Sequence, residues 1–400
     1  MAEMEKMSEG MTVVTKISPS YLYSSEFTLA LKMFKAAFPE GTSFFISEEN
    51  MADALRDLVR DHIPDVDGYT CVVKEPAVLI EKDTVGEMLK VMRDHPDISC
   101  VLPSDIRGSR PGRAPNYYTM RGFEKFAESL YDPDNAVAPY DGREPWMFIV
   151  RSEFLRSIEI PENPVTIPCS LPPDNVCISL NAYIHPFIDY YKETRSDVLP
   201  YLPKAITSLL DIGCTRGYFG EAVKKERGCK VVGIEINFHE AQEAKSRLDR
   251  VIEGDIFAVD IGEKFDCITC LDVVEHFVQP DEFLLKVKTL LQDNAHLILS
   301  VPNVGHWAVV EDLIAGRWDY IPAGTLCVSH VRFFTKATVE SLLRGNGFRI
   351  VATGEELTPL PDTVAKSIDL LKQAGLEVDE KSLAALRYYI VAQVAVAQRE

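Results

Sequence analysis

The feature that most constrains the fold is an apolar run that ends in a glycine-containing turn and continues into helix-forming sequence. The run covers residues 208–212, the turn holds Gly213 and Gly217, and residues 220–227 alternate polar with apolar positions. A buried parallel strand followed by such a turn and a helix opens a ligand crevice at the carboxyl edge of an α/β sheet. Glycine suits the turn because a side chain would hold a ligand away from the backbone. The sequence therefore predicts an α/β fold with a ligand site beside this turn.

The spacing of the glycines narrows the choice of ligand. A dinucleotide-binding turn has the pattern G-x-G-x-x-G, whereas three residues separate Gly213 from Gly217 here. The next predicted strand, residues 230–236, contains Glu235 near its end, and a carboxylate there can accept hydrogen bonds from both hydroxyls of a ribose. NAD and S-adenosylmethionine (SAM) both carry that ribose, so Glu235 does not distinguish between them.

Asp255 and the residues that follow it resemble the class I SAM-dependent methyltransferases. After Asp255 come a predicted strand at 265–271, Asp272 and the run Val273-Val274-Glu275-His276. The segments 300–307, 316–320 and 330–335 are similar to one bacterial branch of this superfamily, the ubiquinone-biosynthesis type of methyltransferase. The resemblance covers about residues 188–348. It implies a Rossmann-like sheet with strand order 3-2-1-4-5-7-6 and SAM as the cofactor.

The resemblance also implies which residues bind the cofactor, all of them at strand ends or in the glycine turn. They are Gly213, Cys214, Gly217, Tyr218 and Phe219 around the turn, Glu235 and Ile236 at the ribose, Asp255 and Ile256 at the adenine, and Asp211, Leu271 and Asp272 at the methionine end. Two positions depart from the family pattern. Thr215 stands where the family usually has glycine, and Cys327 stands where it usually has aspartate.

Three histidines are candidates for removing a proton from a hydroxyl acceptor, because the pKa of histidine suits that task. They are His276, His306 and His330, and each has a structural alternative as a helix cap, a packing partner or a loop brace. Arg332 could bind an acceptor carboxylate or phosphate through two parallel hydrogen bonds, or it could form an ordinary ion pair. Trp307 and Tyr191 complete the expected acceptor-binding residues.

Composition excludes several other classes of protein. The formal net charge of −19 over 400 residues argues against binding to nucleic acid or to an anionic membrane surface. The first ten residues have no apolar core, and no stretch has the roughly 18 apolar residues of a spanning helix; we therefore expect a cytoplasmic protein. Cys267 and Cys270 are three positions apart in a predicted strand, so their side chains point to opposite faces. We accordingly expect buried cysteines and no metal.

The length predicts two domains, since it exceeds the usual size of one. We expect a disordered tail at residues 1–12, an N-terminal α/β domain at 13–175, and the methyltransferase domain at 176–400. The proline-rich residues 161–173 are interpreted as the linker, and residues 181–195 as a helix that leads into the second domain. The boundary follows from the proline-rich composition, and the resemblance implies that the second domain is the methyltransferase.

Parts of the N-terminal region weakly resemble the acceptor half of family 2 glycosyltransferases. The similar segments are residues 77–85, 95–103 and 146–155. Where that family places its metal-binding aspartates, this chain has Lys74-Glu75-Pro76, and one glutamate beside a lysine is a poor site for a divalent ion. The region is therefore interpreted as a degenerate relative of these enzymes, with an unrelated α/β accessory domain as the alternative.

The leading hypothesis is a SAM-dependent methyltransferase that acts on an oxygen atom of a small molecule or glycan. One alternative is a glycosyltransferase whose activity lies in the N-terminal domain. Another is a non-catalytic SAM-binding scaffold, for which the departures at Thr215 and Cys327 leave room.

Overall fold

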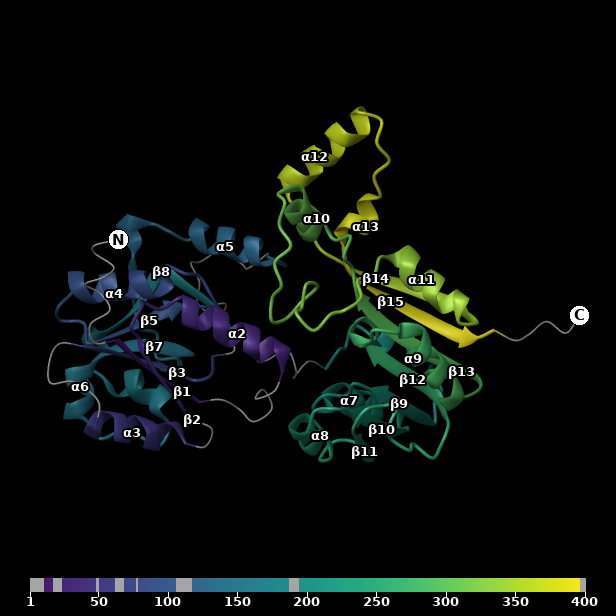
Figure 1. The fold of residues 1–400 in the computed structure, drawn as a ribbon, viewed down its shortest axis with the longest axis horizontal. Helices are drawn as coiled ribbons and strands as arrows, with labels where there is room; N and C mark the ends of the chain where they lie inside the picture. The colour runs from purple at the N-terminus through teal and green to yellow at the C-terminus, as the bar shows by residue number, and fades with distance from the viewer. Residues whose placement is uncertain are drawn as a thin grey trace, which may run out of the picture. The chain divides into compact units, whose positions relative to one another are not determined.

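The computed structural model divides the chain into two compact units, Met1–Ile188 and Asp189–Glu400 (Figure 1). It describes residues 11–16, 24–47, 50–61, 68–76, 78–105, 117–186 and 194–395. The expected boundary at 175/176 is wrong, because strand β8 (Val176–Pro186) pairs with β5 in the sheet of the first unit. Residues 181–186, expected to be helical, belong to that strand.

The first unit is built on a mixed sheet in the order β2-β1-β3-β7-β5-β8-β4, with β6 paired to β8. β3 and β5 both run antiparallel to β7, whereas β1, β2 and β3 are parallel to one another. The bounds of its strands are β1 (Met11–Lys16), β2 (Ser43–Ser47), β3 (Tyr69–Val73), β4 (Val78–Ile80), β5 (Cys100–Ser104), β6 (Val137–Pro139) and β7 (Met147–Arg151). The expected tail at 1–12 therefore ends too late: Met11 and Thr12 are buried in β1, and residues 1–10 lie outside the described part of the chain.

Helices cover both faces of this sheet, and each face has its own apolar core. α2 (Ser25–Ala36) and α4 (Thr84–Asp94) pack on one face, and α3 (Met51–Asp61) and α6 (Ser152–Ser157) on the other, while α5 (Met120–Ser129) packs against β8. Alternate residues of one strand reach opposite faces. Val13 and Val14 of β1 illustrate this, since they lie in the two different cores.

The proline-rich residues 161–173 are not an exposed linker. They contain a short 3₁₀ helix, η3 (Pro164–Ser170), whose Val165 and Ile167 are buried in the core beneath α3. A high proline content indicates that regular backbone hydrogen bonding is absent. This is true both of a buried 3₁₀ turn and of an extended linker. The sequence therefore revealed an irregular segment but not its burial.

The second unit contains a seven-stranded sheet among its described residues, in the order β11-β10-β9-β12-β13-β15-β14. Numbered from β9 within the unit, this order is 3-2-1-4-5-7-6. β9 to β13 are parallel, and β15 is antiparallel to both of its neighbours. The bounds are β9 (Ser208–Ile212), β10 (Lys230–Glu235), β11 (Arg250–Glu253), β12 (Phe265–Leu271), β13 (Leu291–Pro302), β14 (Phe348–Leu357) and β15 (Ala385–Val394).

Helices again flank the sheet. α7 (Tyr218–Arg227) and α8 (Phe238–Ala244) share a core on one face, and α9 (Pro280–Leu290) and α11 (Lys336–Gly345) share the other. α10 (Trp307–Ile314) follows β13. α12 (Asp362–Gln373) and α13 (Glu380–Ala384) form the insertion expected between the last two strands, at the yellow end of the ribbon (Figure 1). Sequence signals for these helices are clear: Pro280 opens α9, and Thr335 with Thr338 forms a capping box on α11.

Two further expectations concern composition. Cys267 and Cys270 are fully buried free thiols within β12, as expected from their strand position. Within the described residues, no helix is both long enough and apolar enough to cross a membrane.

Candidate active site

The glycine turn between β9 and α7 lies at the carboxyl edge of the parallel strands. Gly213 has φ +74° and Gly217 has φ +80°, a region that side chains disfavour. A Cβ on Gly213 would also lie 2.7 Å from the Cγ2 of Val273. Thr215, where the family pattern has glycine, adopts the left-handed φ of +46° despite its side chain. The turn therefore keeps its tight conformation at Thr215, although the family usually has glycine there.

Glu235 ends the neighbouring strand β10 and is fixed by the same turn. Its Oε2 accepts a hydrogen bond from the amide of Thr215 at 2.9 Å, and its Oε1 accepts one from the amide of Asn237 at 2.8 Å. The side chain is 7% exposed, and burial raises the pKa of the carboxyl against the opposing effect of these amides. Each carboxylate oxygen has a second lone pair. Glu235 can thus accept from two further donors, which fits the two hydroxyls of a ribose.

The other expected cofactor residues fall into two groups. Ile236 is 71% exposed, and Asp255 is exposed with its carboxylate accepting from the amide of Phe257 at 2.9 Å, so both could face a bound base. The side chains of Cys214, Phe219 and Ile256 instead lie in the apolar cores. Packing in these cores fixes the positions of the three side chains.

Tyr218 and Leu271 have partners of their own. The guanidinium of Arg247 lies 4.0 Å from the centroid of the Tyr218 ring and donates a hydrogen bond to its hydroxyl at 3.0 Å. Leu271 is half-buried at the end of β12 and packs on the core beneath α7.

Asp211 is buried in β9 beneath the glycine turn. Its Oδ1 accepts a hydrogen bond from the hydroxyl of Thr269 at 2.7 Å. Burial raises the pKa of Asp211 to about 7, although Thr269 and the nearby Arg195 act in the other direction. Asp211 therefore holds its proton to a much higher pH than an exposed aspartate does.

Asp272, just beyond β12, is held by two arginines that sequence reasoning did not identify. Its Oδ2 lies 3.0 Å from both Arg195 Nη1 and Arg387 Nε, and its Oδ1 accepts from the Ser300 hydroxyl at 2.7 Å. Burial opposes ionisation, but the arginines and Ser300 outweigh it and lower the pKa of Asp272. The charge of this carboxylate is therefore already balanced. No sequence signal marked Arg195 or Arg387, because they lie far from Asp272 in the chain.

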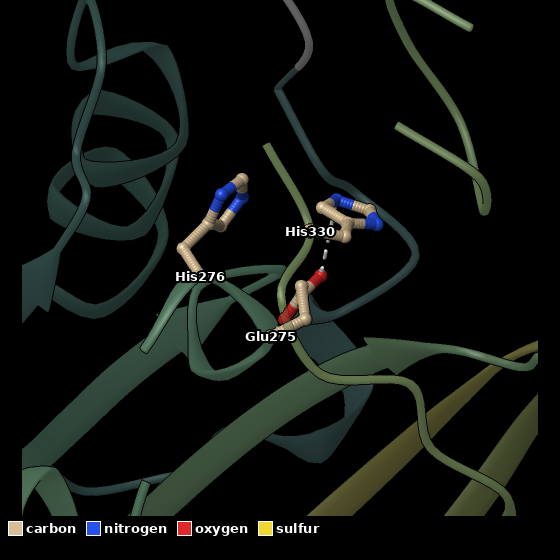
Figure 2. A group of neighbouring side chains, drawn as sticks. All are labelled: Glu275, His276 and His330. Atoms are coloured by element: carbon tan, nitrogen blue, oxygen red, sulfur yellow. Dashed lines mark ion pairs between the residues drawn. The ribbon is translucent and has the colours of Figure 1, made fainter. Parts of the chain in front are cut away.

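Glu275, His276 and His330 converge near the end of β12 (Figure 2). One ligand atom from each residue lies within 4.8 Å of the others, and His330 Nε2 is 3.9 Å from Glu275 Oε1. Glu275 is 1% exposed, and neither carboxylate oxygen has a hydrogen-bond partner among the described residues. Burial, followed by the charge of Asp272, raises the pKa of Glu275 well above its usual value. Sequence analysis predicted no metal, yet this is a set of side chains that could hold one.

The backbone fixes the two halves of this cluster together. The amides of Val331 and Arg332 both donate to the carbonyl oxygen of Glu275 at 3.0 Å. These two hydrogen bonds therefore hold the loop that contains His330 against the short 3₁₀ helix η7 (Val274–His276). The ring centroids of His276 and His330 are 4.8 Å apart in an edge-to-face arrangement, and His276 is the exposed member.

His306 and Trp307 are placed in structural roles. His306 is fully buried: its Nδ1 accepts from the amide of Ala308 and caps α10, and its Nε2 lies 2.8 Å from the hydroxyl of Thr358. Burial lowers the pKa of His306 to about 4, so the ring stays neutral. Trp307 is 8% exposed and donates to the same hydroxyl at 3.3 Å. Both residues therefore brace the start of α10 rather than line the edge with Glu275.

The remaining acceptor candidates divide as follows. Arg332 donates a hydrogen bond to the carbonyl of Val278, which ties its side chain to the segment after η7. Tyr191 lies outside the described residues. Trp318 is 36% exposed and packs edge-to-face on Phe333, which lies three residues after His330. The segment 316–320 is part of the family resemblance, but the sequence analysis assigns no role to Trp318.

Comparison with known proteins gives a family match that lies mostly within the second unit. Residues 183–353 match the family model described as a methyltransferase domain. Among curated relatives, the ubiquinone biosynthesis O-methyltransferase of Leptothrix cholodnii is 24% identical over 164 residues, which are 38% of this chain and 68% of that protein. The one from Stutzerimonas stutzeri is 29% identical over 129 residues, 29% of this chain and 54% of that protein. The matches thus span between about half and two thirds of these relatives.

Solved structures of the same kind also match. A SAM-dependent methyltransferase from Archaeoglobus fulgidus is 19% identical with a TM-score of 0.38, covering 50% of this chain and 93% of that one. The magnesium protoporphyrin IX methyltransferase from Synechocystis PCC 6803 is 17% identical with a TM-score of 0.37, covering 52% and 84%. Residues 183–353, which include the glycine turn and Glu235, are thus similar to a methyltransferase domain, and S-adenosylmethionine is the cofactor that such a domain uses.

Proposed function

We propose that this chain transfers the methyl group of SAM to an oxygen atom of a small-molecule or glycan acceptor. The observation that carries the proposal is that Glu235 ends β10 while Glu275 and His276, grouped with His330, follow β12, and that both strands belong to one parallel sheet. The carboxyl ends of parallel strands meet at one edge, where α/β folds bind their ligands. The names of the relatives, which specify O-methylation, support oxygen as the target.

The cofactor side of the proposal uses residues whose geometry is already fixed. Glu235 binds the ribose hydroxyls, while Gly213 and Gly217 allow the backbone to approach the cofactor closely. Arg195 donates to Asp272 at 3.0 Å and to the Ser300 hydroxyl at 3.2 Å, so a cation stands beside the strand ends. We assign Arg195 to the carboxylate of the methionine end, because charge-assisted hydrogen bonds are the strongest available there.

Most of the rate enhancement would come from alignment of the two reactants. SAM supplies a methyl group on a positively charged sulfur. A lone pair of the acceptor oxygen forms the new carbon–oxygen bond, and the carbon–sulfur bond breaks with its electron pair passing to sulfur, which becomes neutral. The proton of the acceptor hydroxyl must leave, and we assign its removal to the cluster of Glu275, His276 and His330 rather than to His306, whose ring nitrogens are both engaged.

The experiment is a transfer assay with purified full-length protein, SAM carrying a labelled methyl group, and a panel of hydroxylated small molecules and glycans. Mass spectrometry would identify the methylated atom. We expect a methyl ether product and S-adenosylhomocysteine in equal amounts. Binding of SAM with no transfer to any acceptor would contradict the proposal and support a non-catalytic SAM-binding protein. Methylation confined to nitrogen would contradict the assignment to oxygen.

A further inference from the structure

We propose that Arg216 and Arg247 are positioning residues, which hold the glycine turn in the conformation that binds SAM against the backbone strain at Thr215. This role rests on the proposed function only for the cofactor, because it concerns SAM binding and not the transfer of the methyl group. Among the described residues, three contacts tie the turn to helix α8 and the residues after it.

Thr215 has a backbone conformation that its side chain disfavours. Its φ is +46°, in the left-handed region where the Cβ atom lies too close to the following carbonyl oxygen. For a residue that branches at Cβ, such a φ is an outlier even in a turn. A strained residue persists only where the surrounding structure fixes its backbone. The contacts on either side of Thr215 must therefore hold the turn.

The first contact is the carboxylate of Glu235, which joins the turn to the start of α8. One oxygen accepts a hydrogen bond from the amide of Thr215 at 2.9 Å, and the other accepts one from the amide of Asn237, the N-cap of α8, at 2.8 Å. Glu235 is also the residue that we assign to the ribose. A shift of the turn would therefore remove one of the amides that orient the ribose-binding carboxylate.

The second contact is a buried ion pair between the turn and α8. Arg216 donates from Nε to Glu240 Oε2 at 2.6 Å and from Nη2 to Glu240 Oε1 at 3.2 Å, so the two groups pair through two parallel hydrogen bonds. The side chains are only 11% and 5% exposed. Removing one partner of a pair buried in this way leaves an uncompensated charge, which costs far more than at the surface. Arg216, the residue after Thr215, is thereby fixed to α8.

The third contact is Arg247, which follows α8 and reaches back to the turn. It donates from Nη1 to the carbonyl oxygen of Arg216 at 3.1 Å and from Nη2 to the hydroxyl of Tyr218 at 3.0 Å. Its guanidinium also lies over the Tyr218 ring, close enough for a cation–π interaction. A further hydrogen bond from Nη1 to the carbonyl oxygen of Glu243, at 3.0 Å, anchors Arg247 on α8. Arg247 thus contacts the residues on both sides of Gly217.

These contacts predict how SAM binding responds when one of them is removed. Without Arg247 the backbone can relax at Thr215, and only the molecules that keep the strained turn bind SAM. The apparent affinity then falls in proportion to that fraction. The strain of one left-handed residue corresponds to a factor of roughly 5–30. Glycine adopts this φ without strain, so in Thr215→Gly the turn gains nothing by relaxing.

The test is a double-mutant cycle on full-length protein, with SAM affinity measured by titration calorimetry. Arg247→Met should weaken SAM binding by roughly 5–30-fold in the wild-type background. In the Thr215→Gly background, the same substitution should weaken it by no more than about twofold, the usual scatter between independent sites. Arg250→Met is the matched control and should leave the affinity unchanged. Arg250 also donates to a backbone carbonyl, that of Ile261 at 3.0 Å, but at the start of β11, the end of the strand opposite to the turn.

Circular dichroism would verify that each variant is folded. If Arg247→Met does not fold, Glu240→Gln replaces it in the cycle, because it removes the charge that pairs with Arg216 and keeps the size of the side chain. Equal losses of SAM affinity in the two backgrounds, or no loss in either, would overturn the positioning role. At saturating SAM, Arg247→Met should turn over as fast as wild type. If the cycle shows the expected coupling but no acceptor is methylated, the proposed function fails while the positioning role stands.

Discussion

At the scale of single residues, Glu235 is the side chain whose role is most directly testable. Glu235→Ala should weaken SAM binding by about 1.5–3 kcal/mol, the range for hydrogen bonds to a charged group. The matched control is Glu253→Ala, since Glu253 is exposed on β11 and pairs with Glu235 across the sheet. Titration calorimetry would measure both. Equal affinities in the two variants would remove Glu235 from the cofactor site.

Asp211 gives a second residue-scale prediction, which concerns pH. Burial raises the pKa of Asp211 in the folded protein to about 7, well above the ordinary value for aspartate, so the folded state holds a proton that the unfolded state loses in this interval. Its contribution to stability is therefore complete at low pH and is lost as pH rises toward 7. Asp211→Asn removes this titration while keeping an acceptor for Thr269. The free energy of unfolding of wild type relative to Asp211→Asn should fall by about 2 kcal/mol between about pH 5.5 and about pH 8.

Urea unfolding at the two pH values would measure this difference. Asp293→Asn, at an exposed position of β13, serves as the control and should show no comparable change. A wild-type protein whose stability relative to Asp211→Asn does not depend on pH would show that water or a cation already solvates the Asp211 carboxylate.

Residue identity alone could predict some of this site and not the rest. Glu235 and the glycine turn were predicted because a strand end and a tight turn are local features of the sequence. The arginines on Asp272 were not, since nothing near Arg195 or Arg387 in the chain indicates what they approach. His276 and His330 were each predicted as a base. Their convergence with the buried Glu275 depends on how a distant loop packs on η7, which spacing does not reveal.

At the scale of elements, the two glycines that flank α7 allow a matched comparison. Gly217 and Gly228 cap opposite ends of the helix with φ of +80° and +66°. An alanine at either position should destabilise the protein by about 1–2 kcal/mol, because the left-handed backbone conformation is unfavourable for a residue with a Cβ atom. Only Gly217→Ala also meets neighbours, with Leu248 at 3.1 Å and the backbone of Ala244 at 3.3 Å, whereas Gly228 faces open space. We therefore expect SAM affinity to fall in Gly217→Ala and to be unchanged in Gly228→Ala.

Calorimetric titration of SAM into each variant, alongside thermal unfolding, would separate the two effects. A similar loss of SAM affinity in Gly228→Ala would mean that the whole helix α7, and not the turn before it, positions the cofactor.

Elements with strong local signals were also the ones that sequence predicted well. β9, β10 and β12 are short apolar runs with turn residues after them, and α9 begins at a proline. β8 was misassigned because the choice between helix and strand for its second half depends on its partners, β4 and β5. Tertiary pairing of this kind overrides local pattern.

At the scale of the whole molecule, the position of β8 predicts where the chain can be divided. A fragment of residues 189–400 contains the described cofactor residues of the second sheet, and we expect it to fold and to bind SAM with the affinity of the full chain. A fragment of residues 176–400 would in addition carry β8, whose Val176, Ile178 and Ile184 are buried against the first unit's sheet. Without that sheet the strand is an exposed apolar edge, so this longer fragment should aggregate.

Size-exclusion chromatography and SAM titration of both fragments would measure the outcome. If the shorter fragment is insoluble and the longer one is monomeric, β8 belongs functionally to the methyltransferase unit, contrary to the pairing seen here.

The position of β15 has a consequence for how the protein is made. This strand is the last of its sheet in the chain, yet it lies between β13 and β14 and contributes Arg387 to the balance of charge around Asp272. Chains emerge from the ribosome with the N-terminal end first and fold as domains become complete. Until β15 has emerged, β14 has no neighbour on either side and the carboxylate lacks one of its two cations. A message cut short by a premature stop codon would therefore yield a chain with an open sheet, which the quality-control proteases of the cell can recognise and remove.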